Sequence, residues 1–207
     1  QLSEQRATPP KRRRGPMPPM PKNIPSVSDP KMIFQVLTAD QLTEELAELK
    51  PDYIYVPALV MAENFDKVRP FIERGSVPVA VLPRVITDNQ AREVYAALEK
   101  LFDYGVNEAL VGNLGHVFMV RGLGMKVRGD FGLNCFNSHT LDVLANAGFL
   151  SATASFELRL AQVKALAKPL DTELIVYGRL PLMVMENCLF YNRAGECVCN
   201  RGPMKLT

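Results

Sequence analysis

The chain has 207 residues, of which 47% are hydrophobic, so it is long enough to bury a core of ordinary domain size. Its formal net charge of +2 is close to zero, which excludes a whole-protein field that draws it to nucleic acid or membrane. No apolar run approaches the roughly 20 residues of a membrane span, and the first residues do not form a signal peptide. We therefore expect a cytoplasmic protein with reduced cysteines.

Residues 1–30 are rich in proline and carry the basic run Lys11, Arg12, Arg13 and Arg14. Such a segment cannot bury enough apolar surface to offset the entropy of ordering it, so we expect an extended linker. A solvated charge cluster is the favoured interpretation of the basic run, because basic runs alone are weak motifs. The alternative is a contact with the phosphate backbone of an RNA partner.

From Lys31 onward, short apolar segments alternate with helical patterns. The expected strands are Met32–Leu37, Tyr53–Leu59, Val77–Val85, Glu108–Gly112, Lys126–Leu133, Leu150–Ala154 and Glu173–Tyr177. Helical segments separate these strands. Helices are expected to start at Thr38 and Thr87, and others to end at Gly75, Gly105 and Gly148.

This alternation predicts an α/β fold with a parallel sheet. The units are shorter than the roughly 30 residues of a usual barrel unit, and the glycine fingerprint of a dinucleotide site is absent from the sequence. We expect a TIM-barrel-like domain over 31–185, incomplete or with about seven strands. A cysteine-containing segment, 186–207, follows it.

Polar residues follow the ends of these strands, where parallel α/β folds bind ligands. The residues expected to converge there are Arg84, Asn113, Asp130, Asn134, Asn137, Ser138, Glu157, Tyr177 and Arg179. Among these, the candidate catalytic residues are Arg84, Asp130, Asn134, Glu157, Tyr177 and Arg179. The strands themselves look apolar, so this polar edge indicates a functional face.

Structural roles compete with functional ones at several of these positions. Asp130 has the alternative of bonding to its own turn. Asn134, Asn137 and Ser138 can cap helices, and Ser138 is the favoured N-cap. Glu157 and Arg179 either pair with each other or bind a substrate phosphate. His116 and His139 are expected to be ordinary surface or cap residues.

Three cysteines, Cys188, Cys197 and Cys199, form a cluster near the end of the sequence. Thiolates at a common point suit an iron–sulfur cluster or zinc, but the spacing matches no standard zinc finger. Free thiols or an incidental disulfide remain the alternatives. A fourth ligand would be Cys135 or would lie beyond Thr207, although Cys135 is expected first as a small buried hydrophobe.

Four motifs carry a resemblance to a known family. They are GDFGLNCFNS from Gly129 to Ser138, SFEL from Ser155 to Leu158, YGRLPLMVMENC from Tyr177 to Cys188, and CVC from Cys197 to Cys199. In this order they resemble peptidase family U32, the collagenase-like bacterial peptidases, over roughly Lys31 to Thr207. The chain looks most like the repeated C-terminal module of the long two-module members. The resemblance implies a barrel-like α/β fold.

For function, the resemblance implies three alternatives. Some members of the family are iron–sulfur proteins that hydroxylate RNA bases or act in quinone synthesis, and Cys188, Cys197 and Cys199 look like three of their four ligands. Others are collagen-degrading peptidases, although the sequence has no HExxH or GxSxG motif and no Cys-His pairing motif. The third alternative is a scaffold whose barrel mouth binds the remainder of the parent protein. RNA is the expected further partner in the first case.

Overall fold

The computed structural model describes residues 15–16, 18–22, 29–180, 191–192 and 195. Internal contacts divide the chain into two units, Gln1–Ile175 and Val176–Thr207. The α/β domain belongs to the first unit. The basic run at Lys11 and most of the predicted segment 186–207 lie outside the described residues. The predicted boundary after residue 185 stays a prediction.

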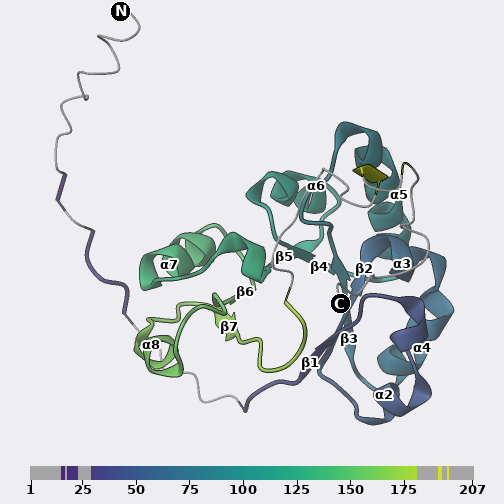
Figure 1. Cartoon of the computed structure of the whole chain (residues 1–207), viewed down its shortest axis with the longest axis horizontal. Helices are drawn as coiled ribbons and strands as arrows, with labels where there is room; N and C mark the ends of the chain where they lie inside the picture. Colours follow the sequence, from purple (N-terminus) through teal and green to yellow (C-terminus); the bar gives the residue numbers. More distant parts are fainter. Residues whose placement is uncertain (1–14, 17, 23–28, 181–190, 193–194, 196–207) are drawn as a thin grey trace, which may run out of the picture. The chain divides into compact units, whose positions relative to one another are not determined.

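Seven strands form one parallel sheet in the order in which they occur along the chain. They are β1 (Ile33–Gln35), β2 (Tyr53–Pro57), β3 (Val77–Val81), β4 (Glu108–Val111), β5 (Lys126–Gly129), β6 (Ser151–Thr153) and β7 (Asp171–Glu173). The sheet curls into a half-barrel (Figure 1). The predicted incomplete, seven-stranded, TIM-like α/β barrel is therefore confirmed.

Helices occupy the connections between the strands. They are α2 (Glu44–Glu48), α3 (Ala58–Glu63), α4 (Phe65–Glu73), α5 (Asp88–Asp103), α6 (Val117–Gly122), α7 (Ser138–Asn146) and α8 (Leu160–Ala165). Three 3-10 turns join them: η1 (Ala39–Gln41), η2 (Leu114–His116) and η3 (Phe131–Leu133). Among the helices of the described residues, none is long and apolar enough to cross a membrane.

Capping side chains fix where two of the helices begin. The backbone N–H of Leu46 donates to Thr43 Oγ1 at 3.3 Å, and the N–H of Thr87 donates to Gln90 Oε1 at 3.2 Å. Both bonds satisfy N–H groups near a helix start, where few intrahelical partners exist. The predicted start at Thr87 is confirmed, since α5 begins at the next residue.

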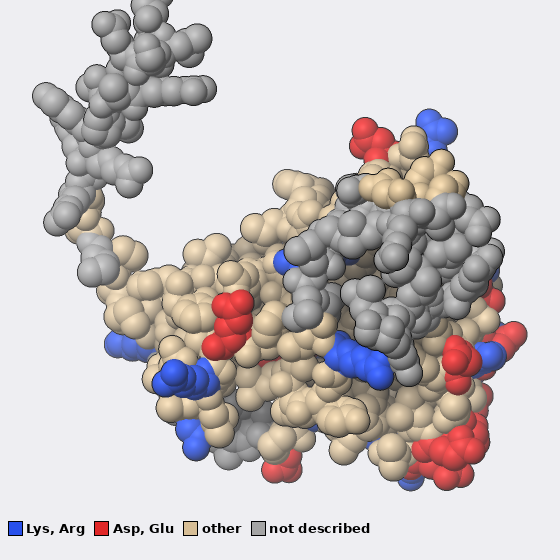
Figure 2. All heavy atoms as spheres, in the orientation of Figure 1, with Lys and Arg blue, Asp and Glu red and all other residues tan. Residues whose placement is uncertain are grey.

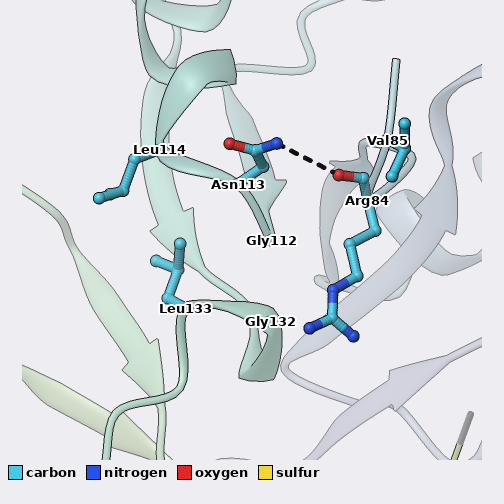
Figure 3. A pocket seen from close by; sticks show the side chains of 7 residues that line it. All are labelled: Arg84, Val85, Gly112, Asn113, Leu114, Gly132 and Leu133. Carbon is cyan, nitrogen blue, oxygen red and sulfur yellow. Dashed lines mark hydrogen bonds between the residues drawn. The ribbon is translucent and has the colours of Figure 1, made fainter. Parts of the chain in front are cut away.

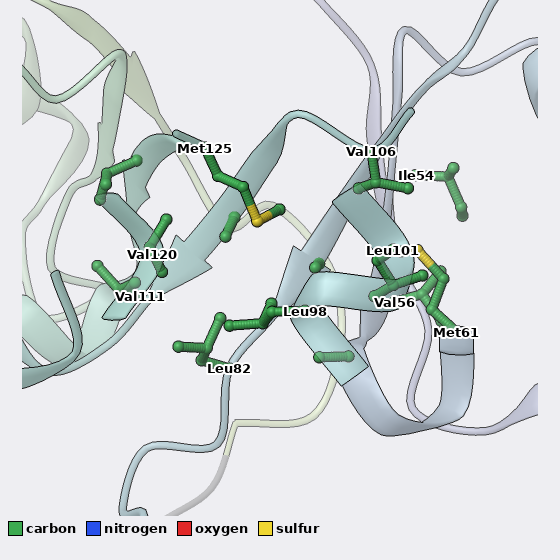
Figure 4. Close-up of a cluster of buried hydrophobic side chains, with 14 of the residues drawn as sticks. Ile54, Val56, Met61, Leu82, Leu98, Leu101, Val106, Val111, Val120 and Met125 are labelled. Carbon is green, nitrogen blue, oxygen red and sulfur yellow. The ribbon is translucent and has the colours of Figure 1, made fainter. Parts of the chain in front are cut away.

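The main hydrophobic core lies between the sheet and the helices (Figure 4). Alternate strand residues contribute one side of it, such as Ile54 and Val111, and helix residues such as Met61 and Leu98 contribute the other. Because successive side chains of a strand point to opposite faces, their neighbours in sequence point to the inner face of the half-barrel. Tyr55 and Leu110 lie on that inner face, in a second, smaller cluster.

The last strand lies earlier in the chain than predicted. We expected a buried strand over Glu173–Tyr177, but β7 ends at Glu173. The residues that follow are exposed, with Val176 90% exposed and Tyr177 97% exposed. Strand propensity favours the apolar run after Glu173, but the strand is the polar segment Asp171–Glu173. This segment pairs with β6, which buries the polar residues Ser151 and Thr153.

Candidate functional site

Arg84 lies at the carboxyl-terminal edge of the sheet, in the loop after β3. Its side chain is exposed, and the guanidinium carbon lies 5.9 Å from the centre of the Phe131 ring in η3. Phe131 in turn packs edge-to-face on Phe156, with ring centres 5.9 Å apart. Phe156 follows β6 and is 45% exposed. Three loops thus bring a cation and two aromatic rings together.

Asp130 follows β5 directly and caps η3. Its Oδ1 accepts a hydrogen bond from the backbone N–H of Phe131 at 2.7 Å. Burial raises the pKa of the Asp130 carboxyl to about 6; the Phe131 N–H and the charge of Arg84 oppose this rise, and the charge of Glu173 adds to it. Asp130 therefore bonds to its own turn, as the structural alternative predicted, and also changes protonation near neutral pH.

Two glycines, Gly112 and Gly132, line an open cavity of about 410 Å³ beside Arg84 (Figure 3). A Cβ on Gly132 would lie 2.7 Å from the carbonyl oxygen of Gly112, and a Cβ on Gly112 would lie 3.6 Å from Asp130 Oδ2. The first distance is too short for real atoms and the second is an ordinary contact, so the close approach of the two backbones requires glycine at position 132. Asn113 lines the same cavity, and its Nδ2 lies 3.5 Å from the Arg84 carbonyl oxygen.

The inner face of the half-barrel holds a buried polar network that the sequence analysis missed. At its centre, Arg128 on β5 is only 4% exposed. Its Nε donates to Glu108 Oε2 at 2.5 Å, and its Nη1 donates to Ser151 Oγ at 2.9 Å and to Glu173 Oε1 at 3.2 Å. The Tyr55 hydroxyl also donates to Glu173 Oε1, at 2.8 Å.

The surroundings of this network favour the charged form of Arg128 and the neutral form of Tyr55. The guanidinium carbon of Arg128 lies 4.1 Å from the ring centre of Tyr53. Burial lowers the pKa of Arg128, but Tyr55, Glu108 and Tyr53 raise it by more, so the net shift is upward. The pKa of the Tyr55 hydroxyl is raised by burial and by the charge of Glu173. Arg128 thus stays charged and Tyr55 stays a neutral hydrogen-bond donor.

The signal for this network was a polar residue at every second position of short strands. Lys126, Arg128 and Asp130 alternate with Val127 and Gly129, and Ser151 and Thr153 stand on either side of Ala152. Treating the strands as apolar throughout was wrong, because β5, β6 and β7 bury charged and hydroxyl groups on the inner face. A period of two in charged residues could have indicated it.

The structure brings only some of the predicted site residues together. Arg84 and Asp130 interact electrostatically across the cavity edge, and Asn113 lines that cavity. Asn134 ends η3 in a left-handed conformation with φ of 52° and is exposed. Glu157 is exposed, and its backbone N–H lies 3.4 Å from Ser155 Oγ.

Tyr177 and Arg179 belong to the second unit of the chain. Both side chains are exposed. The expected convergence of these two residues with the barrel edge, and the expected pairing of Arg179 with Glu157, therefore stay predictions.

The cap of α7 is Asn137, not Ser138. Asn137 Oδ1 accepts from the backbone N–H of Thr140 at 2.9 Å. Ser138 is buried, and its Oγ accepts from the N–H of Ala167 at 2.9 Å instead. The predicted N-cap role of Ser138 was wrong by one residue, because Asn is as good a cap and the chain enters the helix at Asn137.

Cys135 is a buried apolar residue, as expected. It is fully buried in the main core, and burial raises the pKa of its thiol to about 11. Because metals and clusters bind the thiolate, this environment does not fit a fourth ligand. Cys188, Cys197 and Cys199 lie outside the described residues. Within the described part of the chain, His, Cys, Asp and Glu side chains form no group of three or more that could hold a metal ion.

His116 is buried and not at the surface, but it occupies the N-cap position of α6, so the cap alternative of the prediction holds. It is 8% exposed, and its Nδ1 has no hydrogen-bond partner among the described residues. Burial lowers the pKa of its imidazole, so the side chain is neutral at pH 7. The sequence did not indicate this burial, because His116 ends the short turn η2, which has no regular apolar pattern.

Charges of both signs are distributed over the face of the molecule in Figure 2. Lys and Arg side chains lie there in separate small groups, Asp and Glu side chains gather at the lower right, and no basic patch dominates the described residues on this face. This agrees with the net charge of +2. A ligand held at the cavity would therefore depend on local groups such as Arg84.

The sequence profile of peptidase family U32 matches residues 62–203. The match covers most of the chain, including η3 and the cavity-lining residues, and the chain belongs to this family. No curated protein sequence matches the chain significantly.

Proposed function

We propose that this chain is the barrel module of an enzyme that hydroxylates RNA bases, and that a base binds beside Arg84, Phe131 and Asp130. The observation that carries the proposal is the position of Arg84 over Phe131, next to Phe156, at the edge of a cavity. Unstacked RNA bases are commonly held by stacking on aromatic rings and on arginine, and phosphates pair with arginine.

Asp130 supports the same proposal through its protonation state. A carboxyl with a pKa of about 6 exists in both forms near neutral pH. In the protonated form it donates a hydrogen bond to a base nitrogen or carbonyl, and in the ionised form it accepts one from an amino group. The same group can hold or release a proton during chemistry on the base. Asn113 offers an amide at the same cavity for further base-edge contacts.

The iron–sulfur cluster is part of this proposal, with Cys188, Cys197 and Cys199 as ligands. When bound it would supply electron transfer. The proposed ligand set leaves out Cys135, because its side chain is fully buried among the apolar residues of the main core. Zinc at the same thiols remains the alternative metal. Asn134, Glu157, Tyr177 and Arg179 stay predicted site residues, and a cytoplasmic location stays expected.

Binding of a fluorescein-labelled single-stranded oligoribonucleotide, measured by anisotropy, tests the proposal. We expect Arg84→Met and Phe156→Ala each to weaken binding about tenfold, since stacking and charge contacts are worth about 1–3 kcal/mol. Arg92→Met, which removes an exposed charge from α5, is the matched control and should leave the affinity unchanged. All variants are also measured in a chain whose Lys11, Arg12, Arg13 and Arg14 are replaced by neutral residues, so that the basic run cannot bind the RNA. Equal affinity of all variants in this background would contradict the base-binding site.

Metal content tests the cluster separately. After anaerobic purification we expect iron and sulfide, with a brown colour, in the unaltered chain and in Cys135→Ala. Cys188→Ala and Cys197→Ala should lack both. Iron retained in these two variants, or lost in Cys135→Ala alone, would contradict the proposed ligand set.

Peptide hydrolysis is the second candidate function. The family name favours it, and a carboxyl with a pKa of about 6 can act as a general base toward water. The test is cleavage of gelatin and of labelled collagen-like peptides by the unaltered chain and by Asp130→Asn. Cleavage lost in Asp130→Asn, without RNA binding, would favour hydrolysis. Absence of both activities, with tight binding to the remainder of a parent protein, would favour the scaffold role.

A further inference from the structure

Asp130, which follows β5 directly, lies level with Thr153 on β6 and Glu173 on β7 at the inner face. Gly129 pairs with Ala152, so the next residues, Asp130 and Thr153, lie side by side. Thr153 in turn pairs with Glu173. Because neighbouring strands lie about 4.8 Å apart, the backbones of Asp130 and Glu173 are separated by about 10 Å, and both side chains face inward.

Four donors hold the carboxylate of Glu173 in this position. Glu173 Oε1 accepts from Tyr55, Ser151 and Arg128, and Glu173 Oε2 accepts from Thr153 Oγ1 at 3.4 Å. In each of these contacts the partner donates and Glu173 accepts, an arrangement that suits an ionised carboxylate, because it has acceptors only. Its side chain is 12% exposed, so water screens the charge weakly.

We propose that Glu173 is a positioning residue that favours the protonated form of Asp130, beside the cavity, by means of a fixed, buried negative charge. The inference rests on the proposed function, because it assigns a purpose to the protonated form of Asp130. A protonated Asp130 presents a hydrogen-bond donor to the ligand, whereas an ionised one presents only acceptors.

The other groups around Asp130 support this assignment. Arg84, from the loop after β3, is the cation that acts against Glu173, and it lies on the exposed side. From β4, Gly112 approaches Asp130 without a side chain, and from η3 the Phe131 N–H donates to it. From β6, the neighbouring residue is the uncharged Thr153.

One level below Asp130 lies Arg128, two residues earlier on β5. It is paired with Glu108 as well as with Glu173, which offsets its positive charge. Glu173 is thus the nearby anion that acts on Asp130 from the buried side, and it raises the Asp130 pKa.

The test is a ¹³C NMR titration of the Asp130 side-chain carboxyl in the full chain, without any ligand. The resonance is assigned by its disappearance in Asp130→Asn. Glu173→Gln removes the charge but keeps Oε1 as an acceptor, and the rotatable Thr153 hydroxyl can accept from the new amide. We expect the Asp130 pKa to fall by about half to one pH unit, the size of a charge effect over about 10 Å.

Glu108→Gln is the matched control, because Glu108 bonds to Arg128 in the same network. Glu108 begins β4, four residues before Gly112, which by the strand register lies level with Asp130. It is therefore about 13 Å further down the barrel, and its replacement should leave the Asp130 pKa nearly unchanged. An unchanged pKa in Glu173→Gln, or an equal fall in Glu108→Gln, would overturn the proposal.

Glu173→Asp separates the charge from the hydrogen bonds and serves if Glu173→Gln does not fold. This variant retracts the carboxylate and disturbs its bonds but keeps the negative charge. We expect an Asp130 pKa close to that of the unaltered chain, and a fall as large as the one expected for Glu173→Gln would overturn the proposal. Because the titration needs no RNA, its failure is distinct from a failure of the base-binding proposal.

Discussion

Tyr55 on β2 donates its hydroxyl hydrogen to Glu173 Oε1 on β7 at 2.8 Å, although 118 residues separate them in sequence. Five strand spacings lie between β2 and β7, which is about 24 Å on a flat sheet. Two side chains cannot reach across that distance, so the bond requires the sheet to curl. The same contact closes the inner network beneath the cavity and links the barrel fold to the site.

Removal of the central cation should destabilise the barrel strongly. Arg128→Met leaves Glu108 and Glu173 buried without their ion-pair partner, which we expect to lower the free energy of unfolding by about 3–5 kcal/mol. Arg69→Met is the control, because its pair with Asp66 is exposed and worth less than about 1 kcal/mol. Urea denaturation at pH 7 measures both. Similar losses in the two variants would argue against a structural role of the network.

A methyl group at Gly132 should disturb the cavity. Gly132→Ala places a Cβ 2.7 Å from the Gly112 carbonyl oxygen, so the backbone must shift, and we expect a loss of about 1–3 kcal/mol. Gly122→Ala is the control, because Gly122 ends α6 with nothing within 4 Å of the added Cβ. That variant should be as stable as the unaltered chain or up to about 1 kcal/mol more stable. Thermal and urea unfolding compare them, and a fully stable Gly132→Ala would disprove the close approach.

Asp130 should make stability fall as pH rises. Its pKa is about 6 in the folded chain and about 3.9 in an unfolded one, so the folded state binds the proton more tightly. The resulting stabilisation is complete below about pH 4 and is lost as pH rises through 6, by about 2–3 kcal/mol in total.

Asp130→Asn removes this dependence, since the amide stays neutral and its Oδ1 can still accept from Phe131. We expect the variant to gain about 2 kcal/mol relative to the unaltered chain between pH 4 and pH 7. Urea unfolding across this pH range measures the difference in the free energy of unfolding between the two chains. Other titrating groups affect both chains equally, so they do not contribute to this difference. Parallel stability curves would mean that the Asp130 pKa is not raised.

Cys135 should be protected from alkylation in the native state. The thiol is buried in the main core and its pKa is raised to about 11, so little reactive thiolate is present at pH 8. Mass spectrometry after iodoacetamide treatment should find Cys135 unmodified in the native chain and modified after unfolding in urea. Rapid modification of the native chain would place Cys135 outside the core.

The order of the strands and their parallel arrangement could be predicted from the sequence. Apolar runs such as Tyr53–Pro57 and Val77–Val81 alternate with capped helices, and this pattern determines a parallel sheet. Arg84 and Asp130 were placed at this edge because they follow predicted strands in the sequence. They became site candidates because ligands bind past the carboxyl ends of parallel strands. Neither step required knowledge of long-range contacts.

The buried network and the last strand could not be predicted in the same way. Arg128 and Glu173 are polar residues in short strands, and only the curling of the sheet reveals that they meet. The apolar run after Glu173 fits strand propensity better than Asp171–Glu173 does, but pairing with β6 selects the polar segment. The two cavity glycines were also missed, because their role depends on a backbone contact distant in sequence.

Photo-crosslinking tests the central claim, a base-binding site at the mouth of the half-barrel, most directly. A single-stranded oligoribonucleotide with 4-thiouridine is irradiated with the full chain, and the crosslinked residues are mapped by mass spectrometry. We predict crosslinks in the peptides that contain Phe131 and Phe156, weakened in Arg84→Met. Crosslinks confined to the basic run around Lys11–Arg14, with none at the mouth, would contradict the account.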